Sequence, residues 1–104
     1  MAAKQRAPSK SGDTYSAVFL SRESGLDMVQ VDFKGSLLTL VSKADGTFCM
    51  CNGRPIKSDL LIRRNDVLLS VAGKRVVGSP MNEVEALMSS SPRPVTLEFR
   101  ANVR

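Results

Sequence analysis

Residues 62–73, IRRNDVLLSVAG, place a short apolar run between two turns. Asn65-Asp66 favours a turn because Asn tolerates a left-handed backbone. The run that follows, Val67–Val71, is rich in residues common in strands, and Ala72-Gly73 turns the chain again into Lys74–Val77. The sequence therefore predicts two short antiparallel strands, and Ile62 is expected to anchor the segment before it, Pro55–Leu61, to the core.

Three further strand-like runs lie upstream. Met28–Phe33 alternates apolar and polar residues, which predicts a half-buried strand with the apolar residues 29, 31 and 33 on its inner face. Leu37–Ser42 and Thr47–Cys51 flank Asp45-Gly46, a dipeptide typical of tight turns, and are predicted to form a hairpin. The segment that follows, Pro55–Leu61, suits one or two helical turns that begin at proline.

The period changes downstream of these strands. Residues 81–90, MNEVEALMSS, carry apolar side chains at 81, 84, 87 and 88, the spacing of an amphipathic helix. Ser79 can cap the first amides, and Pro80 fits the start of the helix. Pro92 ends it, and Val95–Phe99 alternates as a closing strand.

Length and composition indicate one domain. The chain has 104 residues, 42% of them hydrophobic, which is enough for one core and too few for two. We expect a disordered basic tail over residues 1–12, an N-terminal extension of uncertain structure over 13–27, the folded domain over 28–101 and a C-terminal tail over 102–104. Within the extension, Tyr15–Leu20 is either a short strand or an appended element.

Residue counts limit the chemistry. The chain contains no His, which excludes Ser-His-Asp and Cys-His nucleophilic pairs and His metal sites. Cys49 and Cys51 share one face of a predicted strand, too poorly oriented for a disulfide and too few for a zinc site. We therefore expect no enzyme activity, metal or cofactor. Without an apolar run of membrane-spanning length or a signal-peptide core, we expect a cytoplasmic location.

The central segment resembles a family signature. Residues 62–73 resemble the PDZ domain pattern L-x-x-G-D-x-(I/L)-L-x-V-N-G, which they match at Asp66, Leu68, Leu69, Val71 and Gly73. Asn65 and Ala72 stand where the family has Gly and Asn. The resemblance implies an α+β fold for residues 28–101, a PDZ-like, partly open β-barrel or sandwich of five to six mainly antiparallel strands, capped by one short and one longer helix.

The family's function is the binding of protein C-termini. The resemblance implies β-augmentation, in which a peptide adds a strand to the sheet beside the long helix and a glycine-containing loop holds its carboxylate. We expect the groove between strand 37–41 and helix 80–90. The implied peptide-binding residues are Lys34, Gly35, Ser36, Leu37, Leu38, Thr39, Leu40, Val41, Met81, Glu85 and Met88. A second candidate for the carboxylate loop is Ser24-Gly25-Leu26-Asp27-Met28, which spells the family motif better.

Three residues of the predicted groove bear on which ligand it would bind. Met81 occupies the helix position that in the family contacts the third-last ligand residue, so the resemblance implies partners with apolar last and third-last residues. Glu85 either selects a basic ligand side chain or only faces solvent. The first candidate for the carboxylate loop is Lys34–Thr39, in which Leu38 replaces a glycine. Leu38 and Glu85 favour an alternative hypothesis: a scaffold or dimerisation module that has lost carboxylate binding.

A third hypothesis is nucleic-acid binding. The chain carries a formal charge of +5 at pH 7. Its basic residues are dispersed, however, with Arg63-Arg64 and Lys74-Arg75 as the only pairs in the body, and aromatic residues for stacking are few. A nucleic-acid partner is therefore disfavoured.

Overall fold

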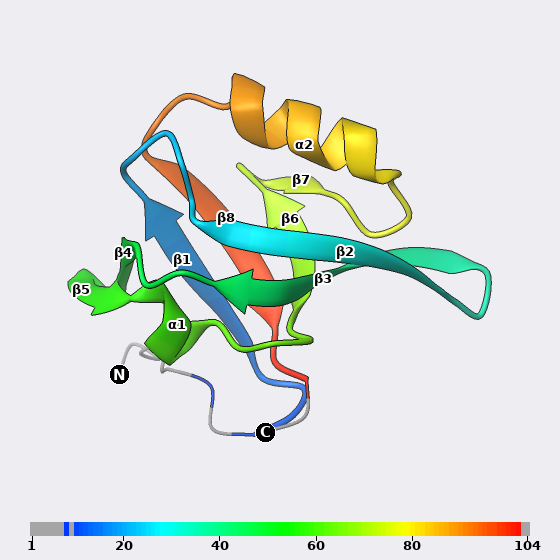
Figure 1. Ribbon diagram of the computed structural model, residues 1–104, viewed down its shortest axis with the longest axis horizontal. Coiled ribbons are helices and arrows are strands. Elements are labelled where there is room, and N and C mark those ends of the chain that lie inside the picture. Colours follow the sequence, from blue (N-terminus) through cyan, green and yellow to red (C-terminus); the bar gives the residue numbers. More distant parts are fainter. Residues whose placement is uncertain (1–7, 9, 103–104) are drawn as a thin grey trace, which may run out of the picture.

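The computed structural model describes Pro8 and residues 10–102 of the chain. An eight-stranded antiparallel sheet runs through these residues, in the order β2-β3-β6-β8-β1-β4-β5 with β7 beside β6 (Figure 1). The elements are β1 Thr14–Phe19, β2 Leu26–Phe33, β3 Ser36–Ala44, β4 Phe48–Cys51, β5 Arg54–Lys57, α1 Ser58–Leu61, β6 Val67–Val71, β7 Lys74–Arg75, α2 Met81–Ser90 and β8 Val95–Arg100.

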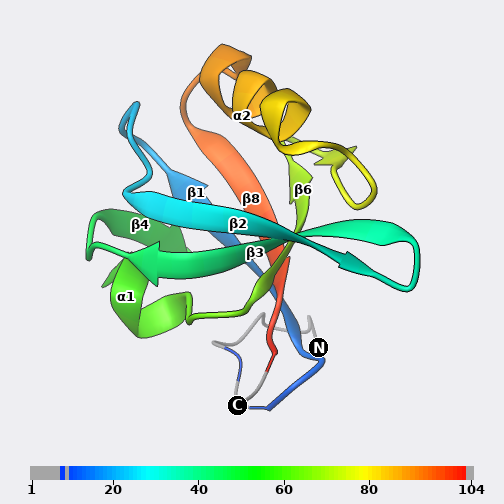
Figure 2. The same cartoon turned by 45° about the vertical axis from the view of Figure 1, so that its right-hand side comes forward.

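The expected α+β architecture with one short and one longer helix is confirmed. The described residues form eight strands, more than the five to six expected, because β1 and β5 also join the sheet. The longer helix, α2, lies beside β6, whereas α1 lies beside β3 and β5. The two helices lie at opposite ends of the view in Figure 2.

The first strand corrects the expected domain boundary. β1 lies between β8 and β4, and its alternate residues Tyr15, Ala17 and Phe19 are buried in the core. The Tyr15 ring stacks on Phe99 of β8, with the ring centroids 5.4 Å apart. Residues 13–27 are therefore not an extension, and the folded unit begins well before residue 28.

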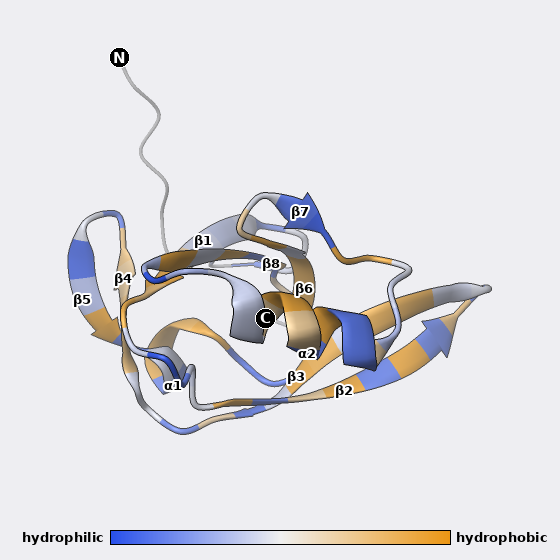
Figure 3. Cartoon of the chain, turned by 90° about the horizontal axis from the view of Figure 1, so that it is seen from above, coloured by the Kyte–Doolittle hydropathy of each residue, from blue (hydrophilic) through white to orange (hydrophobic). Residues whose placement is uncertain are grey.

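The inner face of β2 is the opposite of the one predicted. Met28 lies opposite Val41 of β3, which is fully buried, so residues of even number point toward the core. Val29, Val31 and Phe33 are exposed instead, and Figure 3 shows both hydrophobic and hydrophilic residues along the strand. The prediction failed because both faces of the strand carry apolar residues, Leu26 and Met28 on the inner face and Val29, Val31 and Phe33 on the outer one.

The predicted hairpin across Asp45-Gly46 is wrong. β3 pairs with β2 and β6, whereas β4 pairs with β1 and β5, so the turn carries the chain from one part of the sheet to another. The Asp45 carboxylate accepts hydrogen bonds from the amide and hydroxyl of Thr47, at 2.9 and 2.6 Å, which holds this turn. The predicted helix from Pro55 shrinks to the four residues of α1, because Arg54–Lys57 pairs as β5.

The segment from β6 to α2 agrees closely with its sequence pattern. The strand Val67–Val71 has its predicted bounds, and Asn65 adopts φ 73° at the turn before it. The predicted helix over 81–90 is confirmed, with Val84 fully buried against the sheet. Ser79 is not its side-chain cap, because Pro80 occupies the capping position and no side-chain hydrogen bond is made there.

A buried carboxylate joins the ends of three strands. Asp66 is completely buried before β6. Its Oδ2 accepts hydrogen bonds from the Tyr15 hydroxyl and, at 3.1 Å, from the Arg63 amide, and its Oδ1 accepts one from the Asn102 amide at 3.1 Å. This side chain therefore holds the start of β1, the entry to β6 and the exit from β8 together.

Most of the expected tails lie outside the described residues. Of residues 1–12 the structure describes Pro8 and 10–12, where the Gly12 amide donates to the Ala101 carbonyl at 2.8 Å. Of residues 102–104 it describes Asn102 alone, and that residue binds Asp66.

The two cysteines are buried free thiols. Burial, with a smaller contribution from the neighbouring Cys51 thiol, raises the pKa of Cys49 from 9.0 to about 11. Since only the thiolate reacts, we expect both cysteines of the folded domain to resist alkylation at about pH 8 and to react at once in denaturant. Quantifying the modified protein by mass spectrometry over time tests this; equally fast alkylation with and without denaturant would contradict it.

The same shift sets a pH dependence of stability. The unfolded thiol releases its proton near pH 9.0, whereas the folded Cys49 thiol keeps it until pH is about 11. The stabilising contribution is therefore fully present below pH 9.0 and is lost as the pH rises through this window.

Candidate functional site

The edge strand β2 lies next to α2 and has one unpaired side. β2 is the first strand in the sheet order, and among the described residues only β3 pairs with it. In an antiparallel edge strand, alternate residues direct both their N–H and C=O groups away from the sheet. These backbone groups can accept a further strand.

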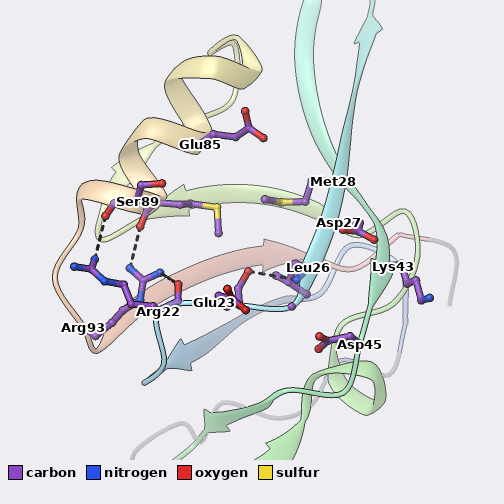
Figure 4. Close-up of a pocket in the computed structure, with 13 residues that line it drawn as sticks. Arg22, Glu23, Leu26, Asp27, Met28, Lys43, Asp45, Glu85, Ser89 and Arg93 are labelled. Carbon is purple, nitrogen blue, oxygen red and sulfur yellow. Dashed lines mark hydrogen bonds between the residues drawn. The ribbon is translucent and has the colours of Figure 1, made fainter.

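A hollow of about 490 Å³ opens between the start of β2 and the second half of α2 (Figure 4). The segment that enters β2 forms one wall, and the helix with the loop after it forms the other. The lining residues are Arg22, Glu23, Ser24, Gly25, Leu26, Asp27, Met28, Lys43, Asp45, Glu85, Met88, Ser89 and Arg93.

Apolar side chains from both walls meet in the hollow. Leu26 and Met28 of β2 and Met88 of α2 line it, and each is half-buried against the core. An apolar side chain that enters here would lose water on several sides, at about 25 cal/mol per Å² of buried apolar surface. Methionine side chains adapt to ligands of different shape. The hollow is therefore suited to an aliphatic group.

Gly25 shapes the segment that enters β2. It has φ +69°, and a Cβ atom there would collide with the Asp45 carboxylate and the Thr47 hydroxyl. The Gly25 carbonyl also accepts a hydrogen bond from the Asp45 amide at 3.0 Å. Only glycine fits both the left-handed backbone and the close approach.

Two arginines connect the two walls of the hollow at the end where the chain enters β2. The Arg93 guanidinium donates to the carbonyls of Ser21 and Arg22 before β2, at 2.9 and 2.7 Å, and to those of Met88 and Ser91 at the end of α2, both at 2.9 Å. Arg22 donates in turn to the Ser89 carbonyl at 3.3 Å.

A glutamine connects the walls at the other end. The Gln30 side-chain amide donates to the Ser79 carbonyl, just before α2, at 2.6 Å and to the Thr39 hydroxyl at 3.3 Å. The separation of β2 and α2 is thus fixed by polar side chains on either side of the hollow.

The hollow carries charges of both signs. Arg22, Lys43 and Arg93 are basic, and Glu23, Asp27, Asp45 and Glu85 are acidic. The hydrogen bonds from Thr47 lower the pKa of Asp45, which therefore stays ionised at neutral pH. Within the described residues Glu85 makes no hydrogen bond or ion pair, and Figure 4 shows it on α2 facing the hollow.

The structure separates the predicted site residues. Glu85 and Met88 line the hollow, whereas Met81, on the first turn of α2, does not and packs half-buried against the core. Lys34 and Gly35 form the turn between β2 and β3, and the other predicted residues, Ser36, Leu37, Leu38, Thr39, Leu40 and Val41, belong to β3.

β3 cannot serve as the receiving strand. It lies between β2 and β6 in the sheet. Two further backbone hydrogen bonds reach β3: its Val41 amide donates to the Asp66 carbonyl, and its Leu37 carbonyl accepts from the Gly78 amide. Both sides of the strand are therefore occupied. The expectation of a groove beside residues 37–41 is wrong, and the second candidate segment, Ser24–Met28, is the one beside α2.

Several lining residues were not predicted. The second candidate segment, Ser24–Met28, lines the hollow, but no local pattern marks Arg22, Lys43, Asp45 or Arg93 as residues that line it. Arg93 binds carbonyls 71 and 72 residues away, and contacts of such separation leave no periodic signal in the sequence.

The described residues include no group of three or more His, Cys, Asp or Glu side chains placed to hold a metal ion. Among the same residues, no helix has the length and apolar character needed to cross a membrane. Comparison of the chain with protein-family models and with curated proteins gives no match.

Proposed function

We propose that this domain is a protein-interaction module of the PDZ type that binds the C-terminal residues of partner proteins along β2. The observation that carries the proposal is the unpaired edge of β2 beside α2, with a hollow where the strand begins. The domain binds and does not catalyse.

In this proposal the peptide adds a strand antiparallel to β2. Backbone hydrogen bonds to the free edge supply affinity, each worth about 0.5–1.5 kcal/mol net. The terminal carboxylate lies at the amides of Leu26–Met28, just after Gly25, where it would replace the Ser24 hydroxyl that accepts a hydrogen bond from the Leu26 amide at 3.3 Å. Arg22 and Arg93 lie at this end of the groove, but Glu23, Asp27 and Asp45 line it as well, so we assign the carboxylate to the backbone amides and not to a net positive charge.

The last ligand side chain enters the hollow between Leu26, Met28 and Met88. We propose an aliphatic residue at this position because these three lining side chains are apolar. The third-last side chain lies nearer the start of α2, between Glu85 and Met81, where the apolar Met81 favours an apolar contact. Affinity in the micromolar range, about −8 kcal/mol, follows from a ligand of this size.

The test is a comparison of free and blocked carboxylates. A peptide mixture with aliphatic last and third-last residues is passed over the immobilised domain, and the tightest binder is made as the acid and as the C-terminal amide. We expect micromolar binding of the acid by calorimetry and about tenfold to hundredfold weaker binding of the amide, because charge-assisted hydrogen bonds are lost.

Three results would contradict the proposal. Equal affinity for acid and amide would support the alternative of a scaffold that binds internal strands without carboxylate capture. Failure to retain any peptide, together with self-association in sedimentation, would favour a dimerisation module. Retention of short RNA that disappears above about 0.3 M salt would favour the nucleic-acid hypothesis.

A further inference from the structure

We infer that Arg93 is a positioning residue that holds the carboxylate-binding segment in its receptive shape; this inference rests on the proposed function. The residue belongs to neither β2 nor α2. It lies between the end of α2 and β8, in the loop that ends at Val95.

Most of the N–H groups of the Arg93 guanidinium are occupied by hydrogen bonds. A guanidinium has five N–H groups in one plane. In Arg93, Nε donates to the Ser21 carbonyl, Nη2 to the Arg22 carbonyl, and Nη1 to the carbonyls of Met88 and Ser91. All four acceptors are backbone atoms, so the side chain fixes the course of the main chain in two segments at once.

These two segments are the walls of the hollow. Ser21 and Arg22 precede Gly25 in the segment whose amides would meet the ligand carboxylate, and Met88 lines the other wall. Carboxylate capture by amides requires their N–H groups to converge before the ligand arrives, because ordering a loop on binding weakens affinity. Arg93 holds the segment before β2 in this arrangement, although Arg93 itself lies outside that segment.

Geometry and charge make different predictions for a lysine at this position. Lysine keeps the positive charge but has a single nitrogen and cannot reach four carbonyls in one plane. If Arg93 acts by positioning, Arg93→Lys loses the preference for a free carboxylate. If it acts only by attracting the anion, Arg93→Lys keeps that preference.

The experiment measures the acid and amide forms of the selected peptide on the wild type, on Arg93→Lys and on Arg75→Lys. Arg75 lies exposed on β7 and controls for an arginine-to-lysine change elsewhere. We expect the wild type and Arg75→Lys to bind the acid at least tenfold more tightly than the amide. For Arg93→Lys we expect this ratio to fall below about threefold, with affinity for the amide changed by less than about threefold.

Each outcome is decisive. An unchanged ratio in Arg93→Lys, or an equal loss for acid and amide, overturns the positioning role while the proposed function stands. A wild type without any preference for the acid overturns both. If Arg93→Lys does not fold, the solvent exchange of the Arg93 Nε–H proton in the wild type is measured by NMR. The inference predicts that this proton exchanges slowly and that only the acid peptide slows it further. Exchange as fast as in free arginine would contradict the inference.

Discussion

Replacing Asp66 with alanine should destabilise the domain by about 4 kcal/mol or more, because three hydrogen bonds to a buried carboxylate are lost. The Tyr15 hydroxyl and the amides of Arg63 and Asn102 would each lose this acceptor in the interior, where water does not replace it. A domain of this size has a free energy of unfolding of about 5–15 kcal/mol, so the variant should lie near the limit of folding.

Denaturant unfolding followed by circular dichroism measures this effect. The control is Tyr15→Phe, which removes one of the three hydrogen bonds and keeps the ring stacked on Phe99. We expect it to cost about 1–2 kcal/mol. An Asp66→Ala domain within about 1 kcal/mol of the wild type would show that Asp66 does not hold the strand ends together.

Replacing Gly25 with alanine should weaken binding of the acid peptide at least tenfold, the equivalent of about 1.4 kcal/mol. The new Cβ atom would collide with the Asp45 carboxylate and the Thr47 hydroxyl, and the left-handed backbone would cost about 1–2 kcal/mol in addition. The segment must therefore move, and with it the amides of Leu26–Met28 that are proposed to hold the carboxylate. Calorimetry with the acid peptide measures the loss.

Gly35→Ala is the matched control. Gly35 has φ +82°, so alanine there also adopts a left-handed backbone, but no atom lies within 4 Å of the added Cβ. The residue sits in the turn between β2 and β3, away from the hollow. We expect a similar conformational cost and unchanged affinity. If Gly35→Ala lost affinity for the acid peptide and Gly25→Ala bound it normally, the carboxylate loop would be residues 34–39 instead.

The sequence predicts an element well where one local rule dominates. The strand Val67–Val71 and the helix over 81–90 were found because a run of β-prone residues and a period near 3.6 are each unambiguous. The sequence does not place β1 in the sheet, although Tyr15, Ala17 and Phe19 share one face, because pairing with β8, some eighty positions later in the chain, leaves no local pattern.

The candidate site was harder to predict for the same reason. Two segments, 24–28 and 34–39, had comparable local patterns, and only the sheet order reveals that β3 has partners on both sides. Alternation along β2 could not show which face is buried, since Leu26 and Met28 compete with Val29 and Val31. The bonds of Arg93 and Gln30 across the hollow depend on tertiary structure alone.

The most direct test of the account is a titration of the 15N-labelled domain with the acid peptide, followed by amide chemical shifts and hydrogen exchange. We predict shifts concentrated in Leu26–Gln30 of β2 and Glu85–Met88 of α2, with slower exchange of the outward-facing β2 amides once a strand is added. Shifts centred on Lys34–Val41, or β2 amides whose exchange stays unchanged at saturation, would contradict the claim that a partner's C-terminus extends the sheet at β2.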